Sequence, residues 1–212
     1  MATWGPTEIA ANGDDGYRSG SDWFASQCYM GKDVADSFDS GFRFLNVTVL
    51  AGSTIDSATL TIRSRATQTA ATDTHFTVAG DDVDDAAAWS ATSRPDQITQ
   101  TTATVAWNPA AWVNDTAYGI TITSIIAEIV ARAGWASGND LRLAVLDNGS
   151  SNSVVLRAWD FSDEYGIATL TIAYTAASGG LTFAATDAQG TQADATSGFR
   201  TMAATVTDNL NA

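Results

Sequence analysis

The chain has 212 residues, a net charge of −14 and an isoelectric point near 4.1. Its hydrophobic share of 45%, with seven tryptophans, is enough for a packed core and excludes a disordered chain. Ten residues are Lys or Arg, which argues against nucleic acid and anionic membranes as partners, because phosphates are bound by clustered cations. No apolar run reaches the roughly 18 residues of a membrane-spanning helix. The N-terminal residues lack the basic start and apolar stretch of a signal peptide, so we expect the chain to remain or assemble in the cytosol.

Aspartate dominates the acidic residues. Of the 24 acids, the glutamates are Glu8, Glu128 and Glu164, and the remainder are aspartates. Aspartate favours turns and caps, whereas glutamate favours helix interiors. This bias, with many Thr, Gly and Ser residues, indicates short strands joined by loops.

Five segments alternate apolar and polar residues with a period of two, which predicts half-buried strands. In chain order their apolar faces are Ala58–Leu60–Ile62, Phe76–Val78, Tyr118–Ile120–Ile122, Leu141–Leu143–Val145 and Leu170–Ile172–Tyr174. The run from Phe42 to Leu50 is less regular. Its alternation slips between Phe44 and Leu45, which indicates a bulge or burial on both faces.

One segment has the pattern of a helix, about ten residues long. Ser124 is the expected N-cap, and Gly134 occupies the expected C-terminal cap position. An apolar stripe lies between them, made of Ile125, Ile126, Ile129, Val130 and Ala133. A single short helix among strands is expected to close one end of a sandwich.

Turn signals separate the predicted strands at Asn12-Gly13, Ala51–Ser53, Ser137–Asp140 and Asp147–Ser150. The Asn148-Gly149 pair predicts a hairpin between the strands that contain Val145 and Val154. No long helices alternate with the strands, which excludes a parallel sheet and favours an antiparallel sandwich or barrel.

The segment after Tyr174 differs in composition. Residues 176–180 are small, and residues 181–212 are rich in Ala and Thr with few apolar anchors. Two interpretations remain open: a short extra hairpin, or an arm that orders against a neighbouring molecule, which we favour. We therefore expect a β-sandwich domain over residues 1–175 and a C-terminal extension or assembly arm over residues 176–212.

Five segments follow one another in an ordered set: Asp14–Tyr17, Gly41–Ile62, Thr104–Trp107 with Trp112, Ile126–Trp135 with Ser137–Asn139, and Ala168–Tyr174. Through these segments, residues 10–175 resemble a jelly-roll domain found in phage virion proteins and some bacterial surface proteins, related loosely to the sandwiches of carbohydrate-binding modules. The resemblance implies an all-β, antiparallel jelly-roll β-sandwich with one short helix and a C-terminal arm. It does not imply one function, because this fold supports carbohydrate binding, adhesion and capsid decoration alike.

No motif indicates catalysis. His75 is the single histidine and is expected on a strand surface, and no Gly-x-Ser-x-Gly turn, phosphate loop, dinucleotide-binding glycine motif or histidine pair is present. We therefore predict no catalytic, cofactor-binding or metal-binding residues and no cofactor, and expect that the chain is not an enzyme. A hydrolase on a sandwich scaffold would need convergent polar groups around a pocket.

Paired carboxylates occur at Asp14-Asp15, Asp81-Asp82 with Asp84-Asp85, and Asp163-Glu164. Adjacent acids on loops do not supply the two carboxylates on opposite sides of a bond that a glycosidase needs. Acidic loops are able to bind a structural Ca²⁺. Solvated acidic loops are the preferred interpretation, with Asp81 to Asp85 as the stretch that would bind Ca²⁺ otherwise.

The seven tryptophans and the cysteine have structural and functional interpretations. Trp107, Trp112 and Trp135 are assigned to the core, and Cys28 is assigned as a buried free thiol. The remaining tryptophans, Trp4, Trp23, Trp89 and Trp159, are not assigned. If they are exposed, they favour glycan binding or a protein interface.

The leading hypothesis is a phage structural protein exposed on the virion: a capsid decoration, head-fibre or tail-associated protein. Its expected partners are copies of itself, with a trimer favoured by analogy, and other virion proteins such as the major capsid protein. A host-surface glycan is left open as a partner, while nucleic acid and membranes are not expected. The alternative is a carbohydrate-binding module or adhesin, which predicts a line of exposed aromatic side chains.

Overall fold

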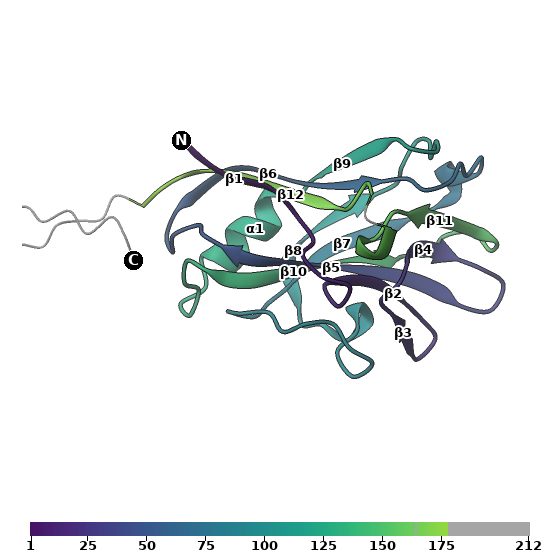
Figure 1. Ribbon diagram of the computed structural model, residues 1–212, viewed down its shortest axis with the longest axis horizontal. Helices are drawn as coiled ribbons and strands as arrows, with labels where there is room; N and C mark the ends of the chain where they lie inside the picture. Colours follow the sequence, from purple (N-terminus) through teal and green to yellow (C-terminus); the bar gives the residue numbers. More distant parts are fainter. Residues whose placement is uncertain (164, 178–212) are drawn as a thin grey trace, which may run out of the picture. The chain divides into compact units, whose positions relative to one another are not determined.

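The computed structural model describes residues 1–163 and 165–177, and these form two facing antiparallel sheets (Figure 1). The four-stranded sheet contains β1 (Ala2–Glu8), β12 (Thr169–Thr175), β6 (Thr54–Arg63) and β9 (Ala117–Thr121), in that spatial order. The larger sheet contains β11 (Val154–Ala158), β4 (Cys28–Lys32), β5 (Ser37–Val47), β10 (Asn139–Asp147), β7 (Phe76–Asp81) and β8 (Gln100–Trp107). A hairpin of β2 (Asp15–Ser19) and β3 (Asp22–Phe24) pairs with β5.

The strand order is that of a jelly roll. The order β1-β12-β6-β9 faces the order β5-β10-β7-β8, so successive strands of the chain cross repeatedly between the two sheets. β4 and β11 extend the second sheet beyond β5. The predicted all-β antiparallel sandwich is therefore confirmed.

The core lies between the sheets and contains the predicted apolar faces. Leu60 and Ile62 of β6, Leu170 and Ile172 of β12, and Leu143 of β10 are all fully buried. The slip predicted in β5 is also present: the register with β10 shifts between Val47 and Phe44. Each sheet turns its apolar side inward because alternate side chains of a strand point to opposite faces.

The predicted helix is present as α1 (Thr123–Val130), which lies between the two layers at one end of the sandwich (Figure 1). Its isoleucines are buried, but the predicted caps are wrong. The N-cap residue is Ile122, without a side-chain hydrogen bond, and the helix ends at Ala131 rather than near Gly134. Burial of the apolar face stabilises this helix without a capping side chain.

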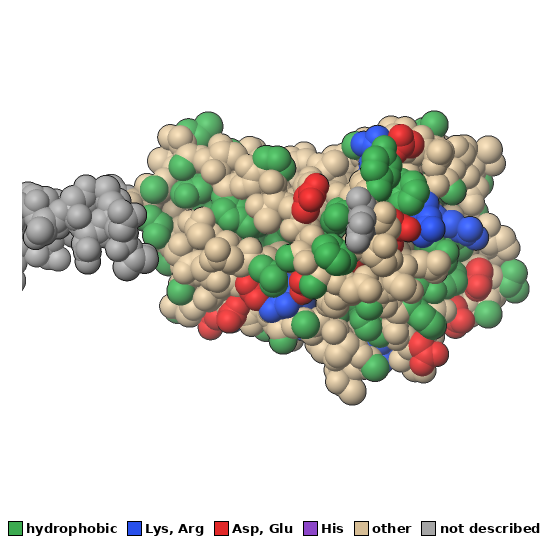
Figure 2. All heavy atoms as spheres, viewed as in Figure 1, with side chains coloured by type: hydrophobic (Ala, Val, Ile, Leu, Met, Phe, Trp, Pro, Cys, Tyr) green, Lys and Arg blue, Asp and Glu red, His purple; other side chains and the backbone are tan. Residues whose placement is uncertain are grey.

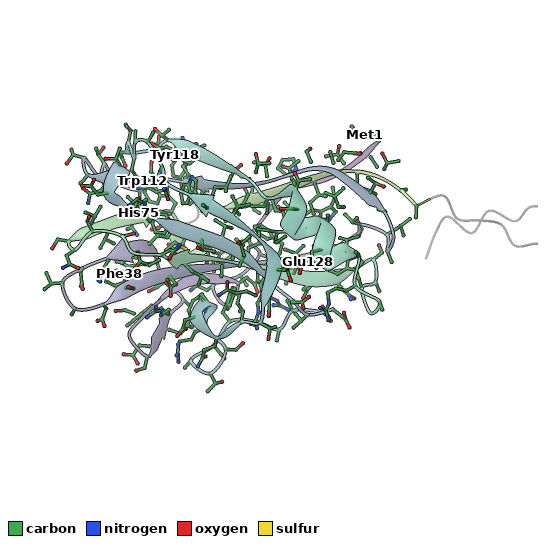
Figure 3. All side chains as sticks on the ribbon, turned by 180° about the vertical axis from the view of Figure 1, so that it is seen from behind. Met1, Phe38, His75, Trp112, Tyr118 and Glu128 are labelled. Carbon is green, nitrogen blue, oxygen red and sulfur yellow. The ribbon has the colours of Figure 1, made fainter. Side chains whose placement is uncertain are left out.

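Glu128 of α1 covers the free edge of β8 (Figure 3). Its two carboxylate oxygens accept hydrogen bonds from the backbone N–H groups of Thr102 and Ala103, each at 2.7 Å. Unpaired N–H groups on an edge strand are a template for pairing with another chain. The helix therefore blocks growth of the larger sheet at this point.

The predicted hairpin at Asn148-Gly149 is wrong. β10 pairs with β5 and β7, while β11 pairs with β4, so β4 and β5 separate the two strands that this loop joins. The loop instead binds the segment before β7: the Asn148 N–H donates to the carbonyl of His75 at 2.8 Å. Asn148 and Gly149 do connect two strands, as predicted, but the residues of a turn do not determine which strands pair.

Three short 3₁₀ helices complete the described elements: Ala71–Asp73, Pro95–Gln97 and Phe161–Asp163. The predicted arm, residues 176–212, lies outside the described residues except for Ala176 and Ala177. Its role in assembly therefore stays a prediction.

Candidate functional site

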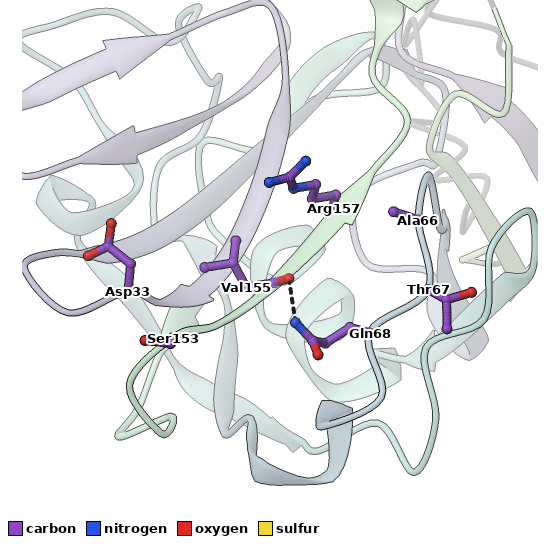
Figure 4. Close-up of a pocket in the computed structure, with 7 residues that line it drawn as sticks. All are labelled: Asp33, Ala66, Thr67, Gln68, Ser153, Val155 and Arg157. Carbon is purple, nitrogen blue, oxygen red and sulfur yellow. Dashed lines mark hydrogen bonds between the residues drawn. The ribbon is translucent and has the colours of Figure 1, made fainter.

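A pocket of about 450 Å³, lined by both polar and apolar groups, lies beside the edge strand β11. Figure 4 shows Val155 and Arg157 on this strand and Ser153 in the turn just before it. Asp33, after β4, lies on one side, and residues 66–68, after β6, lie on the other. The volume is within the range of pockets that bind small molecules, about 300–1,000 Å³.

Backbone geometry creates the hollow. Met30 and Leu156 point into the core, so the neighbouring residues of β4 and β11 face outward. On that outer face, Gly31 pairs with Val155 and has a φ of +111°. A Cβ at Gly31 would overlap the backbone oxygen of Val154. Glycine is therefore required, and no side chain fills the surface next to Val155.

The loop after β6 forms the far wall of the pocket and is bound to the open edge of β11. The Arg65 N–H donates to the carbonyl of Arg157 at 2.8 Å, and the Gln68 side-chain amide donates to the carbonyl of Val155 at 3.4 Å. The Gln68 carbonyl oxygen in turn accepts the N–H of Ala70 at 3.2 Å. These bonds fix the wall before any ligand is present.

Arg157 carries a charge that no carboxylate of the described residues compensates. Every other arginine in residues 1–163 and 165–177 pairs with an aspartate. Figure 2 shows several basic groups beside acidic ones on the face in view. Arg157 instead lies over the ring of Tyr29, with 5.3 Å from its guanidinium carbon to the ring centroid. Lys32 is the second basic residue of this part of the chain without a carboxylate partner.

An aromatic cluster continues from Tyr29. Its members are Tyr17 of β2, Phe24 of β3, Tyr29 of β4 and Phe38 of β5, and the centroid of Tyr17 lies 4.8 Å from that of Tyr29 and 4.9 Å from that of Phe24. Phe24 is 39% exposed. None of these rings lines the pocket, and the cluster is linked to it through Tyr29, whose ring lies under the Arg157 guanidinium.

Two buried carboxyls meet at the start of β2, away from this pocket. Asp15 and Asp160 are both fully buried, although they are 145 residues apart. The Phe161 N–H donates to Oδ2 of Asp15 at 2.9 Å, and the Ser162 hydroxyl donates to Oδ2 of Asp160 at 2.7 Å. The Oδ1 atom of each carboxyl has no hydrogen-bond partner.

This environment favours the neutral acids. Burial raises the pKa of Asp15 to about 8, with further increases from the nearby carboxylates of Asp160, Asp14 and Asp163, against a decrease from the Phe161 N–H. Burial also raises the pKa of Asp160 to about 6, and its contact with Asp163 adds to this. A buried carboxyl without a cationic partner is stabilised by keeping its proton.

The prediction of solvated acidic loops is wrong for Asp14, Asp15 and Asp81, which are buried, whereas Asp82, Asp84 and Asp85 are partly or fully exposed. Asp14 and Asp81 are buried and bind arginines: Asp14 lies 2.8 Å from Arg43, and Asp81 lies 2.6 Å from Arg142. Arg142 also packs over the ring of Trp89, which covers Gly41.

The other aspartates of the Asp81–Asp85 stretch also have partners within the chain. Asp82 and Asp84 both pair with Arg132, and the carboxylate of Asp85 accepts the N–H of Asp140. In the third stretch, Asp163 pairs with Arg65 at 3.1 Å, and Glu164 lies outside the described residues. One oxygen of each of these carboxylates is therefore already bound by an arginine or, for Asp85, by a backbone N–H.

The structure places the remaining candidates as follows. Cys28 is a buried free thiol, as predicted, and burial raises its pKa. His75 is exposed, but it precedes β7 rather than lying on a strand (Figure 3). Within residues 1–163 and 165–177, no three His, Cys, Asp or Glu side chains are grouped so that they could bind a metal ion.

The tryptophans are packed rather than displayed. Trp112 and Trp135 are buried, Trp107 packs against the core, and Trp89 is buried on the outer side of the larger sheet. The other three, Trp4, Trp23 and Trp159, are partly buried. The rings near the pocket are instead Tyr and Phe, which sequence reasoning missed because their four strands pair only in the folded chain.

No protein-family model matches this sequence, and no curated protein matches it either. None of the helices that the structure describes has the length and apolarity needed to cross a membrane.

Proposed function

We propose that the chain is a structural protein of a phage particle, exposed on the virion as a capsid decoration, head-fibre or tail-associated protein. It works through surface contact, with residues 176–212 binding the shell or neighbouring subunits. The observation that supports this proposal is the jelly-roll strand order, which is shared by viral capsid proteins and lectin domains. This support is an analogy of fold, because one fold carries many functions.

The surface of the described domain agrees with dense display. The chain carries a net charge of −14, so copies repel one another at long range and do not adhere without a specific contact. Glu128 blocks the edge of β8 against strand pairing. Assembly then depends on a dedicated segment, and the C-terminal extension is the proposed one.

Two measurements test this proposal. The first is the mass in solution, by light scattering, of the full chain and of a chain that ends after Ala177, which retains every described strand. We expect a trimer that becomes a monomer on truncation. The second is immunogold electron microscopy of particles from cells that carry the gene. A monomer in both forms would remove the assembly arm, and particles without gold would remove the virion function.

A carbohydrate-binding module or adhesin is the second candidate. The pocket beside β11 is the observation that favours it, because its hydrogen-bonding groups suit sugar hydroxyls and its Arg157 stacks on Tyr29 of the aromatic cluster. Glycan-array binding by the full chain tests this candidate. The two functions are compatible, since a displayed domain is able to bind a host glycan.

A further inference from the structure

Arg157 is an exposed cation that lines the pocket, so its guanidinium is accessible to a ligand. In the described part of an acidic chain, seven of eight arginines are paired with aspartates, and the unpaired one lines the pocket beside β11. Its guanidinium lies over Tyr29, and this contact orients the planar group while its N–H donors remain free. A planar fork of donors matches a carboxylate, which it binds through two parallel hydrogen bonds.

The other polar groups match hydroxyls. Oδ1 of Asp33 accepts the N–H groups of Ala35 and Asp36, each at 2.7 Å, which lowers the pKa of Asp33 and leaves Oδ2 free to accept from a ligand. Ser153 is exposed, and its φ of +66° holds it at the turn into β11. One cation, one carboxylate, the hydroxyls of Ser153 and Thr67 and the amide of Gln68 therefore surround a single pocket.

This set of groups excludes ligands with many negative charges. A nucleic acid is bound through several Lys and Arg residues, and the pocket offers one cation beside the carboxylate of Asp33. The net charge of −14 adds repulsion of a polyanion at long range. A ligand with one carboxylate and several hydroxyls uses every group that the pocket presents.

We propose that the pocket beside β11 binds an acidic sugar, with Arg157 bound to its carboxylate and Asp33 accepting from its hydroxyls. This inference rests on the carbohydrate-binding candidate above, and it names the class of sugar. Tyr29, which lies under the Arg157 guanidinium, holds Arg157 in position. The chemistry required is that of a uronic acid residue within or at the end of a glycan chain.

Two ligands that differ at one group test this proposal. The full chain is titrated by calorimetry with a trisaccharide that ends in glucuronate, and with the same trisaccharide ending in glucose. We expect the glucuronate ligand to bind about tenfold more tightly or better, since a hydrogen bond between charged groups is stronger than one between neutral groups. Arg157→Ala should remove this preference, and Arg157→Lys should restore part of it.

Lys32→Ala is the matched control. Like Arg157→Ala, this change removes one positive charge that has no carboxylate partner. Lys32 lies on β4, the strand that pairs with β11, but it does not line the pocket. It should leave the preference unchanged, and thermal unfolding of each variant checks that the domain is folded. Equal binding of both ligands, or a preference that survives Arg157→Ala, overturns the acidic-sugar inference and leaves carbohydrate binding intact. If the chain binds neither ligand nor any glycan on an array, both ideas are wrong.

Discussion

The buried pair Asp15 and Asp160 makes the stability of this protein depend on pH in an unusual direction. Most acids in folded proteins have lowered pKa values, so they stabilise the fold as pH rises. Here the pKa of Asp15 is raised from 3.8 to about 8, and that of Asp160 is raised to about 6. Between pH 4 and pH 8 the unfolded chain has lost the Asp15 proton while the folded chain keeps it. The contribution of Asp15 is therefore complete below pH 4 and is lost as pH rises to 8.

The size of the effect follows from these values. Each pH unit between the two pKa values costs about 1.4 kcal/mol, so Asp15 alone removes about 6 kcal/mol across the whole range. The side chain is fully buried, so solvent does not screen this cost. A domain typically has about 5–15 kcal/mol of stability in total. The loss is therefore large enough to set the upper pH limit of the fold.

The assay is urea denaturation at pH 5, 6, 7 and 8, comparing wild type with Asp15→Asn. Asparagine cannot ionise, and its amide oxygen is still able to accept the Phe161 N–H. We expect the free energy of unfolding of wild type to fall across this range, and Asp15→Asn to be about 4 kcal/mol more stable at pH 7.

Asp22→Asn, at an exposed aspartate that begins β3, is the control for the change of net charge, and it should keep the wild-type slope. The reasoning would be refuted by a wild-type stability that is constant from pH 5 to pH 8. It would equally be refuted by an Asp15→Asn variant with the wild-type slope.

Three further predictions concern packing. Gly31→Ala should destabilise the domain by about 1–3 kcal/mol, because φ is +111° at this residue and a Cβ would overlap the neighbouring strand. Thermal unfolding measures the change, and an unchanged melting temperature would contradict it. Arg142→Ala should cost about 3–5 kcal/mol because it leaves the buried carboxylate of Asp81 without a counter-charge, and adding Asp81→Asn should recover part of the loss in a double-mutant cycle. Glu128→Ala should expose two N–H groups on the edge of β8 and increase self-association by light scattering, whereas Glu128→Gln, which keeps one acceptor, should do so less.

The sequence by itself determined the features that depend on near neighbours along the chain. A period of two at Leu60 and Ile62 identified the inward face of β6, and the isoleucines before Val130 identified the one α-helix of the described residues. Burial of Cys28 followed from its residue type. These predictions succeeded because alternation within a strand and a stripe on a helix are local consequences of backbone geometry.

Only the tertiary structure decided which segments meet. Asn148-Gly149 was recognised as a turn, yet the strands on either side of it lie apart because β4 and β5 pair between them. Asp15 and Asp160 were separate acids in the sequence, and the fold buries them together without a cation. Nothing in the sequence distinguishes Arg157 from the other arginines. Only the fold shows that each of the other described arginines has an aspartate partner and that Arg157 has none. Pairing, burial and charge compensation are long-range properties, because they depend on contacts between residues that can be more than 100 positions apart.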